Sequence, residues 1–189
     1  MAEHGSAAGG DERNRVAILL CGVAFAGKST LARAIARRTG AAIVSLDEIN
    51  ARRGLHGGEG VPEREWATSH HQALAEVERL ATVGTRTIVV DDTSCYRFLR
   101  DDYRAVAERL GYRVALVVID MPPELIRERI RTNAATANRG GIRPEVFERH
   151  RASFEWPAAD EPHVLLRSNA DAETWLERLA RADEATPKT

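Results

Sequence analysis

The segment GVAFAGKS, residues 22–29 of this 189-residue chain, fits the pattern G-x-x-x-x-G-K-[ST]. In that pattern the glycines let the backbone curl, so that successive N–H groups point at phosphate oxygens. The apolar run at residues 16–21 precedes the segment, as expected for a strand that is buried on both faces. The alanine-rich residues 29–38 follow, and a helix there would present its positive N-terminus to the phosphates. The sequence therefore predicts a phosphate-binding loop between a buried strand and a helix.

Lysine usage supports this interpretation. Of the 27 basic residues only Lys28 and Lys188 are lysines, and Lys188 is one residue from the end of the chain. Lys28 is predicted to reach the β- and γ-phosphates of ATP, and the Ser29 hydroxyl to ligate Mg²⁺. The residues predicted to bind the nucleotide are Gly22, Val23, Ala24, Phe25, Ala26, Gly27, Lys28, Ser29 and Thr30.

Strand-like and helix-like segments alternate along the whole chain. Strands are predicted at residues 16–21, 42–45, 87–90, 113–119 and 163–166. Helices are predicted at residues 29–38, 63–82, 96–110, 122–131 and 171–182, with one more that begins at Pro144. This alternation predicts an α/β fold with a mostly parallel, five-stranded sheet and helices on both faces. Ligands of such sheets bind beyond the carboxyl ends of the strands.

Length and composition indicate one globular domain. At about 150 residues per domain, we expect a single domain over residues 15–182, between a flexible leader (1–14) and a flexible tail (183–189). The net charge of −1 argues against a generally basic nucleic-acid-binding surface, and 5% aromatic residues are few for a protein that stacks bases. With two cysteines, no signal peptide and no spanning apolar stretch, we expect a cytoplasmic protein without a membrane partner.

Asp47 lies just past the second predicted strand. A carboxylate there can face the γ-phosphate and accept a proton from an attacking hydroxyl. The alternative is an N-cap for a helical segment over residues 48–52, since aspartate is a preferred capping residue. The position of Asp47 in the sequence does not favour either interpretation over the other.

Asp91 and Asp92 follow the third predicted strand, in the form of a strand end that holds Mg²⁺ through a carboxylate. The alternative is that the two aspartates only form a turn. That interpretation is less favoured because the chain also contains a phosphate-binding loop, which needs a metal ligand of this kind. Which of the two carboxylates faces the metal depends on the strand register and stays open at this point.

Residues 127–151 form a basic region, with seven arginines against three glutamates. Residues 132–143 are polar and predicted to be a loop-like lid, and arginines on a lid would stabilise charge on a transferring phosphoryl group. Arg139, beside two glycines, is the first candidate and Arg131 the second. Solvated helix faces account for some of the other arginines.

His70 and His71 are predicted to be surface or boundary residues, since adjacent side chains on a helix diverge by about 100°. Cys21 and Cys95 show no zinc-ligand spacing and are predicted to be inert.

Three segments in order, residues 20–32, 45–49 and 89–93, resemble the small P-loop kinases of the nucleoside-monophosphate-kinase type over residues 16–182. Their order is similar to that of the AAA-like ATP-binding group that includes polynucleotide-kinase-like enzymes, chloramphenicol phosphotransferase and zeta toxins. The resemblance implies the strand order 2-3-1-4-5 and a general-base role for Asp47. Residues 138–146 resemble the lid of the polynucleotide-kinase branch, which supports Arg139 as a lid arginine. The chain departs from its relatives at Asn50, where they often carry an arginine.

The motifs and the resemblance together predict an ATP- and Mg²⁺-dependent kinase that phosphorylates a hydroxyl of a small molecule, such as an antibiotic or other secondary metabolite. One alternative is a polynucleotide 5′-hydroxyl kinase, which the lid resemblance favours and the net charge disfavours. The other is a nucleotide-binding regulator or slow ATPase without an acceptor, which would not need a base at Asp47.

Overall fold

The computed structural model of the chain describes residues 14–55, 61–136 and 143–184. The strands are β1 (Val16–Cys21), β2 (Ala42–Ser45), β3 (Thr87–Asp91), β4 (Arg113–Ile119) and β5 (His163–Leu166). They form one five-stranded parallel sheet in the order β2-β3-β1-β4-β5. The predicted α/β fold and the strand order that the resemblance implied are both confirmed.

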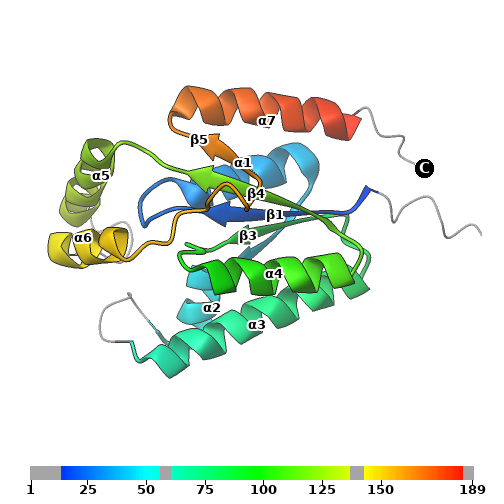
Figure 1. Cartoon of the computed structure of the whole chain (residues 1–189), viewed down its shortest axis with the longest axis horizontal. Coiled ribbons are helices and arrows are strands. Elements are labelled where there is room, and N and C mark those ends of the chain that lie inside the picture. The colour runs from blue at the N-terminus through cyan, green and yellow to red at the C-terminus, as the bar shows by residue number, and fades with distance from the viewer. Residues whose placement is uncertain (1–13, 56–60, 137–142, 185–189) are drawn as a thin grey trace, which may run out of the picture.

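The helices cover both faces of the sheet and its carboxyl edge. They are α1 (Lys28–Thr39), α2 (Leu46–Arg52), α3 (Glu63–Thr82), α4 (Arg97–Arg109), α5 (Pro123–Thr136), α6 (Pro144–Ala152) and α7 (Asn169–Glu184). Figure 1 shows α1 and α7 on one face, α3 and α4 on the other, and α5 and α6 beyond the carboxyl ends of the strands. Both faces of the central strands are therefore covered, while their carboxyl ends face α5 and α6.

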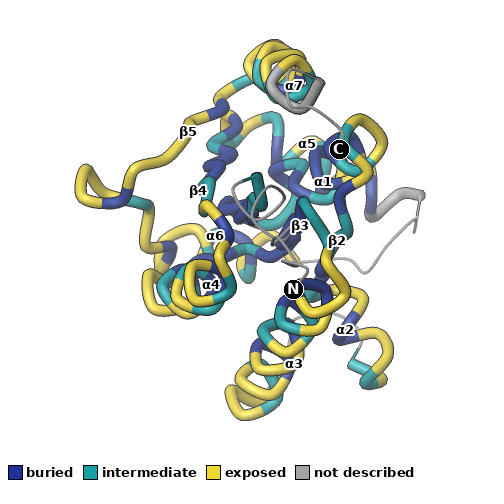
Figure 2. Tube along the Cα trace, turned by 90° about the vertical axis from the view of Figure 1, so that its right-hand side faces the viewer, coloured by how far each residue is buried: buried dark blue, intermediate teal, exposed yellow. Residues whose placement is uncertain are grey.

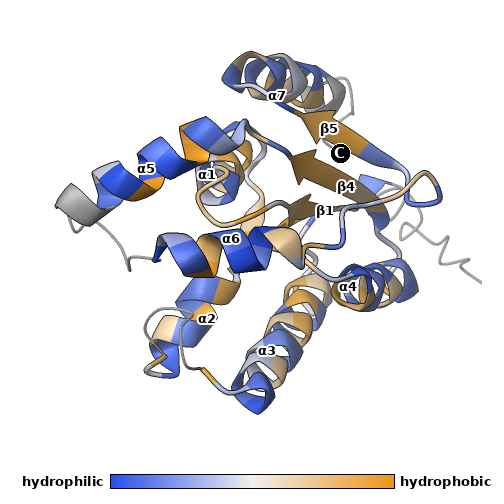
Figure 3. Cartoon of the chain, turned by 60° about the vertical axis from the view of Figure 1, so that its left-hand side comes forward, coloured by the Kyte–Doolittle hydropathy of each residue, from blue (hydrophilic) through white to orange (hydrophobic). Residues whose placement is uncertain are grey.

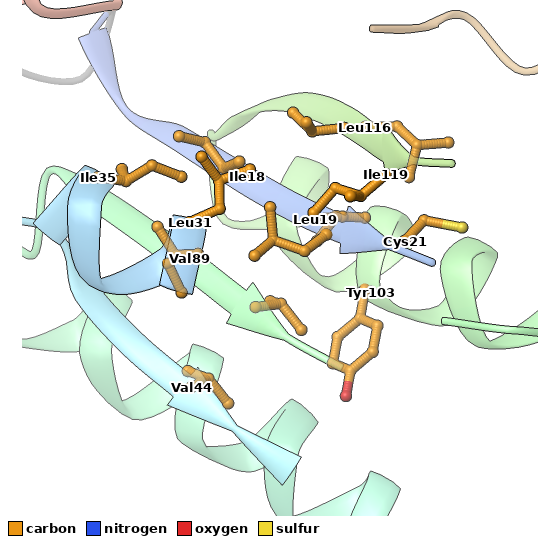
Figure 4. Close-up of a cluster of buried hydrophobic side chains, with 14 of the residues drawn as sticks. Ile18, Leu19, Cys21, Leu31, Ile35, Val44, Val89, Tyr103, Leu116 and Ile119 are labelled. Atoms are coloured by element: carbon orange, nitrogen blue, oxygen red, sulfur yellow. The ribbon is translucent and has the colours of Figure 1, made fainter. Parts of the chain in front are cut away.

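The core forms where these layers meet the central strands. Residues 17–21 of β1 are all buried, which explains why their sequence is a continuous apolar run rather than an alternating one. Figure 4 shows aliphatic side chains of β1, β3 and β4 packed together, with Tyr103 of α4 among them. Each fully buried leucine or isoleucine here contributes about 1.5–3 kcal/mol. The edge strand β5 differs, since only its last residue, Leu166, is buried (Figure 2).

Two helices extend further than predicted. Helix α5 runs to Thr136, so the prediction of a loop from residue 132 is wrong for residues 132–136. That segment contains neither glycine nor proline, and its alanines favour helix. Helix α7 runs from Asn169 to Glu184 and includes the first two residues of the predicted tail. The candidate Arg139, most of the predicted leader and the end of the chain lie outside the described residues. None of the described helices has the length and apolar character needed to cross a membrane.

A buried ion pair joins α4 to the segment before β5. The side chains of Arg100 and Glu161 are 1% and 2% exposed, and two hydrogen bonds of 2.9 and 2.7 Å connect them. The Arg100 guanidinium also donates to the carbonyls of Ser94 and Glu155, both at 2.9 Å. The hydrogen bond from Arg100 lowers the pKa of the Glu161 carboxyl. These contacts fix the backbone of the β3–α4 connection, which borders the site described below.

We expect Glu161→Gln to lower the free energy of unfolding by about 3 kcal/mol or more, because it leaves the buried Arg100 charge without its counterion. Chemical denaturation followed by circular dichroism measures the loss. The matched control is Asp160→Asn, which removes the neighbouring but exposed partner of Arg97 and is expected to cost at most about 1 kcal/mol. Equal effects of the two substitutions would contradict a structural role for the buried pair.

Candidate active site

The phosphate-binding loop connects β1 to α1 at the carboxyl edge of the sheet. Gly22 lies against β4 so closely that a Cβ there would be 2.6 Å from the Ile119 carbonyl oxygen, so only glycine fits. Its N–H donates to the Thr93 carbonyl at 3.1 Å, which ties the start of the loop to the end of β3. Gly27, with φ of 113°, takes a left-handed conformation just before α1 begins. These contacts place the loop where phosphate binding requires it.

Lys28 bridges the loop from within. Its side chain is buried, and its ammonium donates to the carbonyls of Gly22 and Val23, each at 2.9 Å. The charge is thereby held over the curled backbone at the N-terminus of α1. A phosphate group in the loop would add charged oxygens to this set of acceptors, which is the contact predicted for this lysine.

Asp91 is the aspartate that faces the phosphate-binding loop. The Ser29 hydroxyl lies close enough to its carboxylate to lower the pKa of Asp91 by hydrogen bonding. Burial raises the pKa of Asp91, and the Ser29 hydrogen bond and the Lys28 charge oppose that rise. In the register of the sheet Asp91 pairs with Ser45, the last residue of β2. The structure thus brings together Ser29, from the first turn of α1, and Asp91, from the end of β3.

Asp47 stands in the first turn of α2 and lines the same cleft. It does not cap that helix: the Ser45 hydroxyl is the N-cap and accepts the Glu48 N–H at 3.3 Å. The capping interpretation of Asp47 is therefore wrong. The side chain is exposed, and its charge contributes to the raised pKa of Asp91. A capped helix thus carries Asp47 beside the carboxylate at the end of β3.

A single large cleft contains these groups. Its volume is about 1980 Å³, and it runs from the phosphate-binding loop past Asp47 and Asp91 to the faces of α3 and α4. Pockets for drug-sized ligands have volumes of roughly 300–1,000 Å³, so the cleft has room for a nucleotide and a second molecule. Helices α5 and α6, which border it, are largely hydrophilic (Figure 3).

Comparison with protein families gives a match over most of the chain. Residues 18–157 match a family described as the AAA domain. The chain belongs to this family. No curated protein sequence matches it.

Solved structures share the fold of this AAA domain. A sugar kinase from a Janibacter species has a TM-score of 0.65 and 21% identity, with coverage of 89% of this chain and 93% of that chain. The APS kinase of Mycobacterium tuberculosis, solved with AMPPNP and APS, has a TM-score of 0.64 and 15% identity, covering 90% and 98%. A gluconokinase from Sinorhizobium meliloti has a TM-score of 0.59 and 21% identity, with coverage of 90% of this chain and 96% of that chain. At these identities the likeness establishes the fold, which is that of small P-loop kinases.

The AAA domain also holds its loop with an arginine that the sequence did not single out. Phe25 takes a left-handed φ of 64°, which is strained for a bulky residue. The Arg129 guanidinium, from α5, donates to the carbonyls of Phe25 at 3.0 Å and Ala26 at 2.8 Å. Arg129 is one charge among seven in the basic region, so its position could come only from the fold. Arg131, the predicted candidate two residues later, is exposed and does not line the cleft.

Asp92 follows the last residue of β3, in a bend, and has other partners than Asp91. It is buried, and its carboxylate accepts the Thr93 N–H and, at 3.4 Å, the Tyr103 hydroxyl. Burial raises its pKa. The strand register that the sequence could not supply therefore separates the two aspartates into different surroundings.

His70 is buried, so the prediction of a surface or boundary position for it is wrong. It is 6% exposed rather than a surface or boundary residue, and its Nε2 lies 3.0 Å from an Asp102 carboxylate oxygen. The apolar positions of α3 on either side were a usable signal, because His70 shares their buried face with Ala73 and Val77. Cys21 fits the prediction of an inert residue, since burial raises the pKa of its thiol to about 12.

Proposed function

We propose that this AAA domain is an ATP-dependent kinase that transfers the γ-phosphoryl group to a hydroxyl of a small molecule. The observation that carries the proposal is the convergence of Lys28, Ser29, Asp91 and Asp47 in one cleft with room for two substrates. A relative of the same fold has been solved with AMPPNP and APS bound together, which supports such an arrangement.

The phosphate-binding loop has the groups that a triphosphate requires. Backbone N–H groups of residues 22–29 and the N-terminus of α1 attract the phosphates, and Lys28 pairs with them as a point charge. Arg129 stabilises the loop from outside by binding two of its carbonyls. These residues would bind and orient ATP rather than exchange protons with it.

The residues opposite the loop suit Mg²⁺. Ser29 and Asp91 form a small set of hard oxygen ligands, near enough to each other for the Ser29 hydroxyl to lower the pKa of Asp91. When bound, Mg²⁺ neutralises the charge that develops on the phosphate oxygens. Asp91, which contacts Ser29, is favoured over Asp92 for this role.

The proposed chemistry at the acceptor depends on Asp47. An acceptor hydroxyl gives its proton to the Asp47 carboxylate, and its oxygen bonds to the γ-phosphorus. The bond between that phosphorus and the β–γ bridging oxygen breaks, and ADP leaves. Arg139, on the predicted lid, keeps its proposed role in neutralising the developing charge, whereas Arg131 does not line the cleft.

The test is an assay of ADP formation and of phosphorylated product with a panel of hydroxyl compounds and a 5′-hydroxyl oligonucleotide. We expect ADP formation to depend on an acceptor, to stop on addition of EDTA and to return with excess Mg²⁺. A protein that binds ATP without acceptor-dependent turnover would instead be the regulator or slow ATPase considered above. Transfer to the oligonucleotide alone would overturn the assignment of a small-molecule acceptor.

A further inference from the structure

The far part of the cleft, which we term the acceptor end, is lined by many carboxylates and is negatively charged. It is formed by α2, α3, residues 91–96 and the first turns of α4. The carboxylates that line it are Asp47, Glu48, Glu63, Asp91, Asp92 and Asp102. Within the described ranges, neither lysine nor arginine from these elements lines it. Even when Asp91 is assigned to Mg²⁺, the acceptor end remains strongly negative, which disfavours a phosphate-bearing acceptor.

Three arginines of these elements pair with other groups instead. Arg53, after α2, donates to the carboxylate and carbonyl of Glu65 and to the Ser69 hydroxyl. On α4, Arg104 pairs with Asp101, and Arg100 is held by its buried counterion. These three guanidinium groups therefore do not offset the negative charge of the acceptor end.

Two buried polar side chains stand in its wall: Asp92, a hydrogen-bonded carboxylate without an ion pair among the described residues, and His70, one ring nitrogen of which has no partner there. Asp92 is 4% exposed, and it forms no ion pair with any residue that the structure describes. The His70 Nε2 lies 3.0 Å from an Asp102 carboxylate oxygen, and in the tautomer that donates from Nε2 the Nδ1 is an acceptor. That Nδ1 is buried and has no hydrogen-bond partner among the described residues. A ligand with several N–H donors would supply hydrogen bonds to both side chains.

Aromatic side chains complete the acceptor end. The rings of Tyr96 and Phe98 are stacked, with centroids 5.8 Å apart and an angle of 10° between their planes. Phe98 is nevertheless 59% exposed, which is unusual for phenylalanine outside a binding surface. Trp66 of α3 lines the same part of the cleft. Aromatic faces beside carboxylates are the surroundings that bind organic ammonium groups.

We propose that the acceptor is a hydroxyl compound that carries a positively charged amine and no phosphate. The amine pairs with Asp92 and donates to His70, the aromatic residues cover its apolar part, and its hydroxyl lies at Asp47. This inference rests on the proposed function, since it assigns the acceptor of the same reaction.

Two matched series of ligands test the charge preference. In the first, 2-amino-1-phenylethanol, 1-phenyl-1,2-ethanediol and mandelate share a phenylcarbinol and differ in carrying an ammonium, a hydroxyl or a carboxylate. In the second, glucosamine, glucose and glucose 6-phosphate vary the charge on one sugar. Dissociation constants are measured by calorimetry with the full chain, and phosphorylation is measured separately with ATP. We expect the amine to bind at least about tenfold more tightly than its neutral counterpart in each series, and the anion to bind most weakly.

Asp92→Asn assigns the effect to the acceptor end. We expect it to weaken amine binding at least about tenfold and to leave the affinity for the neutral counterpart and for ATP within about twofold. The control is Asp101→Asn, next to Asp102 on α4 but outside the lining of the cleft, which should leave amine binding unchanged. Should Asp92→Asn fail to fold, the ligand series with the wild-type chain still decides the question.

The outcomes separate this inference from the proposed function. Amine binding that depends on Asp92 without phosphoryl transfer would support the acceptor end as an amine site and contradict the kinase. Transfer with a preference for glucose 6-phosphate or mandelate would support the kinase and overturn the amine. Equal binding of all members, or no binding of any, would likewise overturn the amine.

Discussion

Lys28→Arg is expected to abolish turnover of ATP, despite the retained charge. Lys28 is 8% exposed, and its ammonium fits between two backbone carbonyls at 2.9 Å. The planar guanidinium of arginine is larger and forks its donors, so it cannot occupy the space of a compact ammonium inside the curled loop. We expect kcat/KM to fall at least about 10²–10³-fold, the range seen when one preorganised charge-stabilising donor is lost.

A coupled assay of ADP formation measures this loss, and thermal melting reports whether the fold is retained. The matched control is Lys188→Arg, the same substitution at the other lysine of the chain, which should leave kcat/KM unchanged. Near-normal turnover by Lys28→Arg would contradict the role of the loop in phosphate binding.

Asp47→Asn is expected to stop phosphoryl transfer while leaving ATP affinity and stability nearly intact. A general base acts on the acceptor hydroxyl, and such bases contribute typically about 10²–10⁴-fold to the rate. Asparagine matches aspartate in size but cannot take the proton. Because Ser45, and not Asp47, caps α2, the substitution also leaves the helix terminus intact.

Ser45→Ala provides the contrasting variant. Loss of the cap should cost about 1 kcal/mol of unfolding free energy and should not remove transfer selectively. Rapid-quench measurement of the phosphorylated acceptor, with calorimetry for ATP, distinguishes the two variants. If Asp47→Asn transferred phosphate at the wild-type rate, the base would have to be another carboxylate of the cleft, or no base would be used.

The buried strands could be predicted closely from the sequence, because their apolar runs end at clear polar or glycine signals. The bounds of β1 and β4 are those predicted, and β3 is one residue longer. The phosphate-binding loop could be placed because its pattern, its strand and its helix agree. These features are local, so a short run of consecutive residues is enough to predict each of them.

Other features depend on contacts between distant segments. The choice between Asp91 and Asp92 required the register of β3 against its neighbours. Arg129 lies 104 residues from Phe25 in the chain, so only the packed position of α5 brings it to the loop. The burial of His70 depends on α4, whose Tyr103 packs against it with ring centroids 4.9 Å apart. Patterns within a single helix could not supply these relations.

The end of β3 has a consequence for how such a protein can diversify. Asp91, the last residue of β3, lies near Ser29, whereas Asp92, in the bend that follows, accepts a hydrogen bond from Tyr103. Two residues that are adjacent in the sequence, Asp91 and Asp92, thus contact different parts of the structure. Substitution at position 92 can therefore alter the surroundings of α3 and α4 without displacing the phosphate-binding loop.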